Sequence, residues 1–165
     1  MSDILCLYYS RTGKTKKAME EIAAALDAEL VSFTDGEDYS GLGGFLWAGK
    51  TAMRRKTLPI EPYETEKPLS DYRLVILGTP IWAGRCASPV RGLLKRRGLE
   101  LERVAYVLTR GGNRRYDEVC AQMDGYTARE HVLSVSLRVD DVGYAYWRDD
   151  FIQNVKRYME QTYGG

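Results

Sequence analysis

The chain has 165 residues, of which 44% are hydrophobic and 28% are charged. This is the size and composition of one ordinary globular domain, and it excludes a disordered, collagen-like or coiled-coil protein. The 24 Lys and Arg residues nearly balance the 23 Asp and Glu residues, so the net charge of +1 lacks the basic excess of a dedicated nucleic-acid binder. We therefore expect a single domain over residues 1–165 and no nucleic-acid partner.

The cysteines and the one histidine indicate neither a disulfide framework nor a metal site. Cys6, Cys86 and Cys120 lie far apart without a C-x-x-C pair, and His131 has no partner at a metal-like spacing. The N-terminus shows no basic segment with a cleavage motif, and no apolar run approaches the roughly 18 residues of a membrane span. These features predict a cytoplasmic protein with no bound metal and no membrane-spanning helix.

Short apolar runs that end at Gly, Ser, Thr or Asp predict five strands. They cover residues 4–9, 29–33, 74–77, 104–108 and 132–139. The first, third and fourth of these runs are almost continuously apolar, which is typical of strands covered by helices on both faces. The last run alternates between apolar and polar residues, which favours an edge strand.

Apolar residues at helical spacing predict helices between these strands. A glycine-containing helix around Trp47 comes before a basic run at 54–56 and a loop with several prolines. Another helix is expected to start at a Ser88 N-cap followed by Pro89, and to end at Gly98. Further helices are predicted over residues 14–27, over residues 116–125 and from about residue 147 onward.

Strands that alternate with helices over this length predict a doubly wound α/β fold. Each parallel pair of strands needs a crossover, and the crossovers place helices on both faces of a parallel sheet. Sheets of this kind bind ligands beyond the carboxyl ends of their strands, where the strand order reverses. We therefore expect the functional residues in the loops that follow residues 4–9, 74–77 and 104–108.

The loop after the first predicted strand is suited to a phosphate group. Residues 10–15 read Ser-Arg-Thr-Gly-Lys-Thr and lead into a helix whose first amides would point at an anion. Lysines at 14, 16 and 17 oppose the helix dipole, and a bound anion would remove that conflict. A nucleotide P-loop is excluded because Tyr8 stands where its first glycine belongs. The dinucleotide fingerprint G-x-G-x-x-G also fails, since Leu46 takes its third glycine position.

The loops after the next two strands contain residues that shape a ligand site. Residues 78–85 read Gly-Thr-Pro-Ile-Trp-Ala-Gly-Arg. The Trp82 indole offers a flat face for a planar heterocycle, or it folds back onto its own sheet. Residues 109–113 read Thr-Arg-Gly-Gly-Asn, and their paired glycines expose backbone N–H groups. Each segment alone is a weak signal, and the prediction depends on their combination.

Together these segments resemble the flavodoxin-like FMN-binding proteins over nearly the whole chain. The resemblance rests on Tyr-Ser-x-Thr-Gly-x-Thr at 9–15, Gly-Thr-Pro-x-Trp-x-Gly at 78–84, Ser-Pro-Val-Arg at 88–91 and Thr-x-Gly-Gly at 109–112. It implies a five-stranded parallel sheet of order 2-1-3-4-5 with helices on both faces, and FMN as the cofactor.

The resemblance also implies which residues hold the cofactor. The FMN phosphate would lie in the first loop, the isoalloxazine ring beside the second loop, and the pyrimidine side of the ring against the third. The predicted cofactor-binding residues are Ser10, Arg11, Thr12, Gly13, Lys14, Thr15, Thr79, Pro80, Ile81, Trp82, Ala83, Gly84, Thr109, Arg110, Gly111 and Gly112. No side chain is predicted to be catalytic, because a cofactor would supply the chemistry.

The chain departs from the family pattern in two ways. Lys14 stands where the family most often has Asn. The chain is also nearly neutral, whereas flavodoxins that shuttle electrons are strongly acidic. Arginines in or beside the predicted loops are Arg85, Arg110, Arg114 and Arg115. We expect them to favour the negatively charged reduced cofactor and to make its potential less negative than in acidic relatives.

The leading functional hypothesis is an FMN-dependent redox protein that transfers electrons to or from a protein partner or a small acceptor such as a quinone. The alternative is an NAD(P)H-dependent quinone or flavin reductase, in which the arginines would receive a cofactor phosphate. A third hypothesis is a non-redox interaction module with an empty flavin site. The resemblance also leaves a homodimer open.

Overall fold

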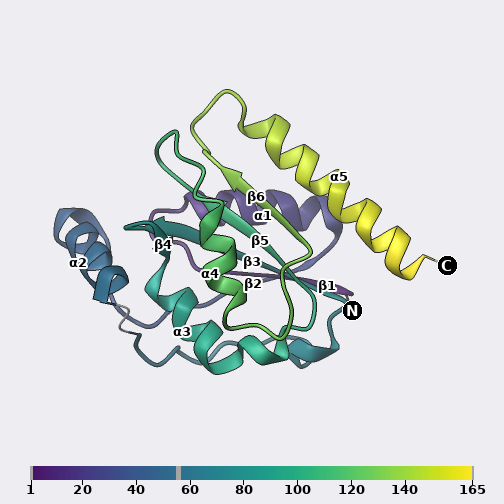
Figure 1. The fold of residues 1–165 in the computed structure, drawn as a ribbon, viewed down its shortest axis with the longest axis horizontal. Helices are drawn as coiled ribbons and strands as arrows, with labels where there is room; N and C mark the ends of the chain where they lie inside the picture. Colours follow the sequence, from purple (N-terminus) through teal and green to yellow (C-terminus); the bar gives the residue numbers. More distant parts are fainter. Residues whose placement is uncertain (1, 55–56, 165) are drawn as a thin grey trace.

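The computed structural model describes residues 2–54 and 57–164, with the backbone alone for residues 51–54. Five parallel strands form the sheet: β1 (Ile4–Tyr8), β2 (Glu29–Ser32), β3 (Leu74–Trp82), β5 (Val104–Thr109) and β6 (Leu133–Leu137). The short β4 (Arg85–Cys86) pairs antiparallel with β3. The strand order is β2-β1-β3-β5-β6, which is the predicted 2-1-3-4-5 when β4 is set aside. The doubly wound α/β fold is thus confirmed, with β6 at one edge (Figure 1).

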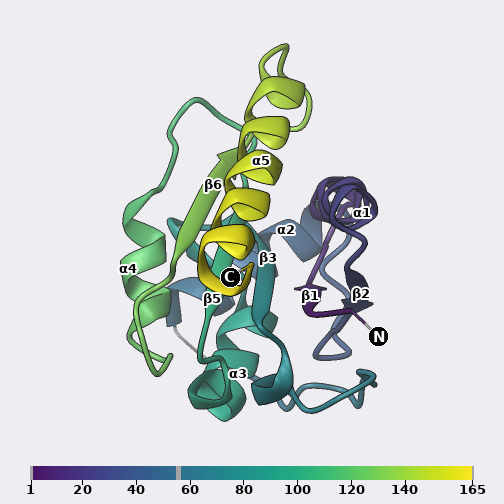
Figure 2. The same ribbon diagram turned by 90° about the vertical axis from the view of Figure 1, so that its right-hand side faces the viewer.

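Helices cover both faces of this sheet (Figure 2). They are α1 (Lys14–Leu26), α2 (Gly41–Arg54), α3 (Ser88–Arg97), α4 (Glu118–Asp124) and α5 (Tyr144–Tyr163). One apolar core joins the sheet to α1 and α5, and the other joins it to α3 and α4. The predicted Ser88 cap is wrong by one residue, because the helix starts at Ser88 and Ala87 is the N-cap. α5 begins earlier than expected, and none of the described helices is long and apolar enough to cross a bilayer.

β3 extends to Trp82, although the sequence predicts that this strand ends at residue 77 and is followed by a loop. Gly78 permits the extension: a Cβ atom there would lie 2.7 Å from Met19 Sδ of α1, so only glycine allows this close packing. The chain then turns through Ala83 and Gly84, both with positive φ (50° and 75°), into β4. Two-residue hairpins favour this conformation. The predicted loop is therefore a hairpin at the carboxyl edge of the sheet.

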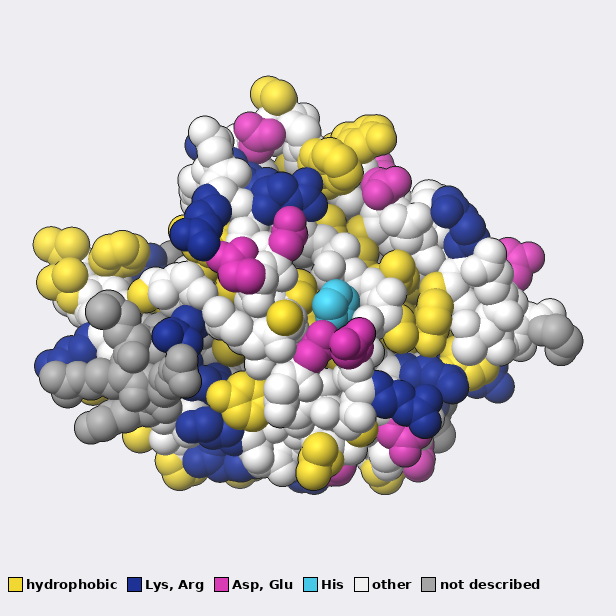
Figure 3. All heavy atoms as spheres, viewed as in Figure 1, with side chains coloured by type: hydrophobic (Ala, Val, Ile, Leu, Met, Phe, Trp, Pro, Cys, Tyr) yellow, Lys and Arg dark blue, Asp and Glu magenta, His cyan; other side chains and the backbone are white. Residues whose placement is uncertain are grey.

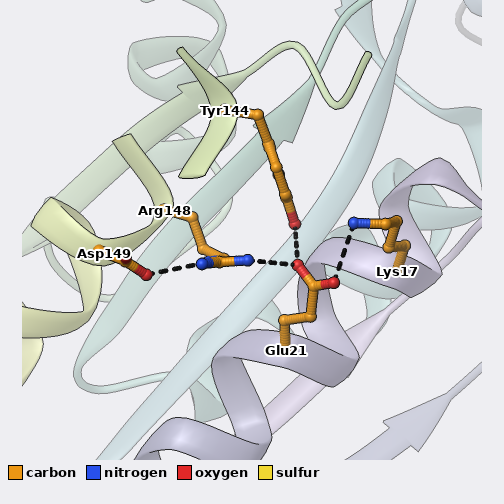
Figure 4. A network of polar contacts seen from close by, with 5 residues as sticks. All are labelled: Lys17, Glu21, Tyr144, Arg148 and Asp149. Atoms are coloured by element: carbon orange, nitrogen blue, oxygen red, sulfur yellow. Dashed lines mark hydrogen bonds and ion pairs between the residues drawn. The ribbon is translucent and has the colours of Figure 1, made fainter. Parts of the chain in front are cut away.

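A network of charged and polar side chains joins α1 to α5 (Figure 4). Glu21 accepts hydrogen bonds from Tyr144 (2.6 Å) and Arg148 (2.9 Å) of α5. Lys17, one turn earlier on α1, donates to the other Glu21 oxygen at 2.9 Å. Burial by itself would raise the pKa of Glu21, but these hydrogen bonds outweigh it and lower the pKa to about 2. The network fixes α1, the helix that follows the β1 loop, against α5.

The three cysteines are free thiols, and all three are buried. Burial raises the pKa of Cys86 to about 11, so this thiol beside the hairpin is held in its neutral form. Cys6 and Cys120 are likewise buried, and burial raises their pKa values to about 12 and about 11.

Candidate functional site

A cavity of about 750 Å³ lies at the carboxyl ends of β1, β3 and β5, with α2 along one side. This is the place where ligands bind in doubly wound sheets. Its lining residues are Arg11, Thr12, Lys14, Thr15, Phe45, Leu46, Ala48, Gly49, Lys50, Pro80, Ile81, Trp82, Ala83, Thr109, Arg110 and Gly111. The structure therefore brings together most of the predicted cofactor-binding residues from all three loops.

Several predicted residues lie outside this lining. They are Ser10, Gly13, Thr79, Gly84 and Gly112. Ser10 Oγ accepts hydrogen bonds from the N–H groups of Gly13 (3.0 Å) and Lys16 (3.2 Å), so it orders the β1–α1 loop. The fully buried Thr79 accepts a hydrogen bond from the Ala87 N–H at 3.0 Å and ties β3 to the start of α3.

The β1–α1 loop presents the amino end of α1 to the cavity. Gly13 precedes the helix with a φ of 94°, in the left-handed region that favours glycine. Thr15 is buried, and its Oγ1 shares a hydrogen bond of 2.7 Å with Thr109 Oγ1, which joins the loop to β5. Ser10 Oγ only accepts hydrogen bonds here, so its O–H can still donate to an anion. The exposed Thr12 and the remaining backbone amides of the loop are further donors for an anion.

The cavity is strongly cationic. Its described lining includes four cations, and no Asp or Glu is among these lining residues. The cations are Arg11, Lys14, Lys50 and Arg110. Arg11 donates to the Tyr39 carbonyl at 2.9 Å, while Lys14 pairs at 2.7 Å with Asp140, which lies outside the lining. Such a charge distribution favours an anionic ligand.

Arg110 is held in the cavity wall by two hydrogen bonds. It donates to Ser136 Oγ at 2.9 Å and to the Gly112 carbonyl at 2.6 Å. Burial, and then the positive charges of Arg115 and Arg138, hold the pKa of Arg110 below its usual value. A bound anion would offset this repulsion.

Neither the protein-family models nor the curated proteins contain a match to this sequence, but solved structures share its architecture. A flavoprotein from Lactobacillus acidophilus NCFM in complex with FMN matches with a TM-score of 0.67 at 23% identity, covering 89% of this chain and 99% of that one. The chain has the flavodoxin fold.

Two further structures show how widely this flavodoxin fold is shared. A flavodoxin described as WrbA-like, from Agrobacterium tumefaciens, matches with a TM-score of 0.62 at 12% identity, covering 98% of this chain and 99% of that one. An NADH:FMN oxidoreductase in its apo form matches with a TM-score of 0.58 at 13% identity, covering 94% of this chain and 89% of that one. At these identities the likeness concerns the fold.

Within this flavodoxin fold, Trp82 is part of the cavity wall but is only 6% exposed. Its ring packs edge-on against Tyr9 (5.6 Å between centroids, 90°) and tilted against Tyr39 (4.7 Å, 56°). This packing fits the second interpretation made from the sequence, in which the indole folds back onto the protein, better than the first, in which its face is free for a ligand. Phe45 of α2, at 59% exposure, is the accessible aromatic ring of the lining.

Arg114 and Arg115, two of the arginines expected to favour the reduced cofactor by their charge, do not line the cavity. Arg114 pairs with Glu118 on α4. Arg115 pairs with Asp117 at 3.4 Å and lies over the Trp147 ring at 5.4 Å. Arg85 is also outside the lining. Carboxylates pair with Arg114 and Arg115, and the charge of Arg115 still acts on Arg110, but the cations within the lining itself are the four named above.

Sequence reasoning missed the α2 side of the site. Phe45, Leu46, Gly49 and Lys50 line the cavity, and the Arg11 guanidinium lies 5.6 Å from the centroid of the Phe45 ring. Their spacing of i, i+1, i+4 and i+5 places them on one helical face, which is visible in the sequence. The direction that this face takes depends on how α2 packs, and no local pattern reveals it.

Proposed function

We propose that this chain binds FMN in the cavity and works as an FMN-dependent redox protein. The observation that carries the proposal is a cavity that joins four cations and the amino end of α1 to an apolar wall, with no acidic residue among its described lining. Its volume of about 750 Å³ lies within the range typical of cofactor sites. The flavoprotein with the same fold that is complexed with FMN supports this choice of ligand.

Each part of the site would have its own task. The amides of the β1–α1 loop, Thr12 and Lys14 would hold the phosphate, because helix N-termini and lysines both stabilise such anions. Pro80 and Ile81 of the hairpin would lie along the ring, and Arg110 at its polar edge. When bound, FMN supplies the electron-transfer chemistry. The lining cations would make the potential less negative, since they stabilise added negative charge.

Flavin titration of the apo-protein tests this proposal. We expect FMN to bind about tenfold to a hundredfold more tightly than riboflavin, because charge-assisted hydrogen bonds contribute roughly 1.5–3 kcal/mol each. FAD serves as a control for the size of the phosphate end. Equal affinity for FMN and riboflavin would contradict a phosphate site, and failure to bind any flavin would favour the non-redox interaction module.

A reductase that passes electrons from NAD(P)H to a quinone or a flavin is the second candidate. The α2 wall favours it, because Phe45 (59% exposed) and Leu46 (64% exposed) give a small organic acceptor apolar surface within the same cavity. Steady oxidation of NADH or NADPH with a quinone would support the reductase, whereas reduction by a protein partner alone would support the carrier. The redox partner, a homodimer and a cytoplasmic location stay predictions.

A further inference from the structure

Two of the four cavity cations, Arg11 and Lys50, lie on the side of the cavity that α2 forms. Lys50 belongs to α2 itself. Arg11 comes from the β1–α1 loop, but its guanidinium is turned toward α2 and lies 5.6 Å from the centroid of the Phe45 ring. Figure 3 shows hydrophobic and basic side chains together on the side of the molecule where Figure 1 places α2. We call Arg11, Phe45, Leu46 and Lys50 the α2 wall; it combines apolar surface with positive charge.

The positive charge of the α2 wall is not neutralised within the described structure. Lys14 pairs with Asp140, whereas neither Arg11 nor Lys50 forms an ion pair with another residue that the structure describes. The α2 residues whose side chains are described, 41–50, include no Asp or Glu. Cations that line an apolar cleft attract anions strongly, because the field there is screened less than in open solvent. The α2 wall therefore has an unanswered preference for a negative charge.

The proposed position of FMN would leave this wall for a second molecule. The phosphate would lie at the amino end of α1 and the ring along the β3–β4 hairpin, which are other sides of the same cavity. The cavity volume of about 750 Å³ is in the upper part of the range of roughly 300–1,000 Å³ that ligand sites occupy. Phe45 and Leu46 are 59% and 64% exposed, so their surface is open to such a molecule. An electron acceptor must lie close to the cofactor, and the α2 wall meets this requirement.

We propose that the α2 wall binds an electron acceptor that is both aromatic and negatively charged, of the class of quinones that carry a carboxylate or sulfonate group. This inference rests on the proposed redox function and names the class of its small acceptor. Phe45 and Leu46 would contact the aromatic rings, while Lys50 and Arg11 would bind the anionic group. Reduction of such a quinone takes two electrons and two protons, gives the hydroquinone, and returns the reduced cofactor to its oxidised form.

The composition of the α2 wall favours this class over two simpler ligands. A neutral quinone would cover the apolar side chains, but it would take Arg11 and Lys50 out of water without giving them a negative partner. A small polar anion such as inorganic phosphate would satisfy the cations and leave Phe45 and Leu46 in water. Only a ligand that carries both a ring system and a negative charge uses both parts of the wall.

The test is calorimetric binding to the oxidised, FMN-loaded protein, in which no electrons can be transferred. The probes are naphthalenesulfonate and its neutral analogue of the same shape, naphthalenesulfonamide. We expect the sulfonate to bind about tenfold more tightly, and added salt to reduce this preference. Lys50→Gln should lower the preference to about threefold or less, because it removes one of the two cations. Lys156→Gln, at an exposed position of α5, is the matched control and should keep the full preference.

A kinetic measurement on the same variants extends the test to the reaction. Lys50→Gln should slow the reoxidation of the photoreduced protein by a naphthoquinone sulfonate about threefold or more, and leave its reoxidation by the neutral menadione unchanged. Equal binding of the two probes, a preference that Lys50→Gln leaves intact, or displacement of FMN by the sulfonate would overturn this inference and leave the proposed function standing. A chain that binds no FMN would overturn both.

Discussion

α1 and α2 form two sides of one cavity but are held in different ways. α1 is fixed by the Glu21 network with α5 and packs so closely on β3 that Gly78 has no room for a Cβ atom. The inner side of α2 is also closely packed, because a Cβ atom at Gly44 would collide with the Tyr39 backbone. Its other residues Leu42 and Phe45 are exposed, and no heavy atom lies within 4 Å of a Cβ built at Gly43. The α1 side, which is suited to a phosphate of fixed shape, is therefore preformed. The α2 side, which would meet an acceptor of variable shape, keeps exposed surface.

The packing contrast predicts the largest effect. Gly78→Ala should lower the free energy of unfolding by about 2 kcal/mol, because the new methyl group collides with the buried Met19. Gly43→Ala on α2 should cause no loss and a gain of a few tenths of a kcal/mol, since alanine is the better helix former. Urea denaturation of both variants measures the difference. Equal losses would mean that α2 is packed as tightly around Gly43 as α1 is around Gly78.

The two lysines of the cavity separate the phosphate side from the α2 side. Lys14→Ala should weaken FMN binding about tenfold, or ~1.4 kcal/mol, and leave riboflavin binding unchanged. Lys50→Ala should weaken FMN binding less than about threefold, because Lys50 lies on α2 and not at the amino end of α1, where the phosphate is proposed to bind. Calorimetric titration distinguishes the two. A larger effect at Lys50 would place the phosphate on the other side.

The Glu21 network predicts a pH dependence on the α1 side. The folded pKa of Glu21, about 2, lies below its ordinary value of 4.5, so its contribution is complete above about 4.5 and is lost as the pH falls toward about 2. At neutral pH, Glu21→Gln should cost about 1 kcal/mol, a value kept low because the side chain is one-third exposed. Urea unfolding should show this cost shrinking with acid. Glu20→Gln is the control, since Glu20 forms only a 3.9 Å exposed pair with Lys16; equal behaviour of the two variants would rule out a special role for the network.

The smallest effect is expected at the exposed aromatic ring of α2. Phe45→Ala should weaken FMN and riboflavin binding alike, by about threefold, because a ring contact contributes roughly 0.5–1.5 kcal/mol and is independent of the phosphate. Fluorescence titration with both flavins measures it. A loss confined to FMN would instead implicate Arg11, which lies beside this ring. Trp82→Ala is a poorer probe, since Trp82 is buried and its removal would destabilise the fold.

Local patterns were sufficient for the kinds and order of the elements. Apolar runs and helical spacing depend on a few neighbouring residues, so β1, α1 and β5 were predicted within a residue or two of their bounds. Alternation of strands and helices then placed the cavity at the carboxyl edge. β3 was predicted too short because Gly78 is a turn signal locally, whereas here it makes room for Met19 of a distant helix.

The use of each side chain was decided by contacts between distant segments. Thr15 is predicted to meet a phosphate, and the structure adds a hydrogen bond between its hydroxyl and that of Thr109 on another strand. The sequence left open whether Trp82 offers its face to a ligand or folds back, and the structure shows Tyr9 and Tyr39 packed against its ring. A sequence shows that a hydroxyl or a ring is present near the binding edge. Only packing determines which other residues contact that hydroxyl or ring, because burial and hydrogen-bond partners arise when segments far apart in the chain come together.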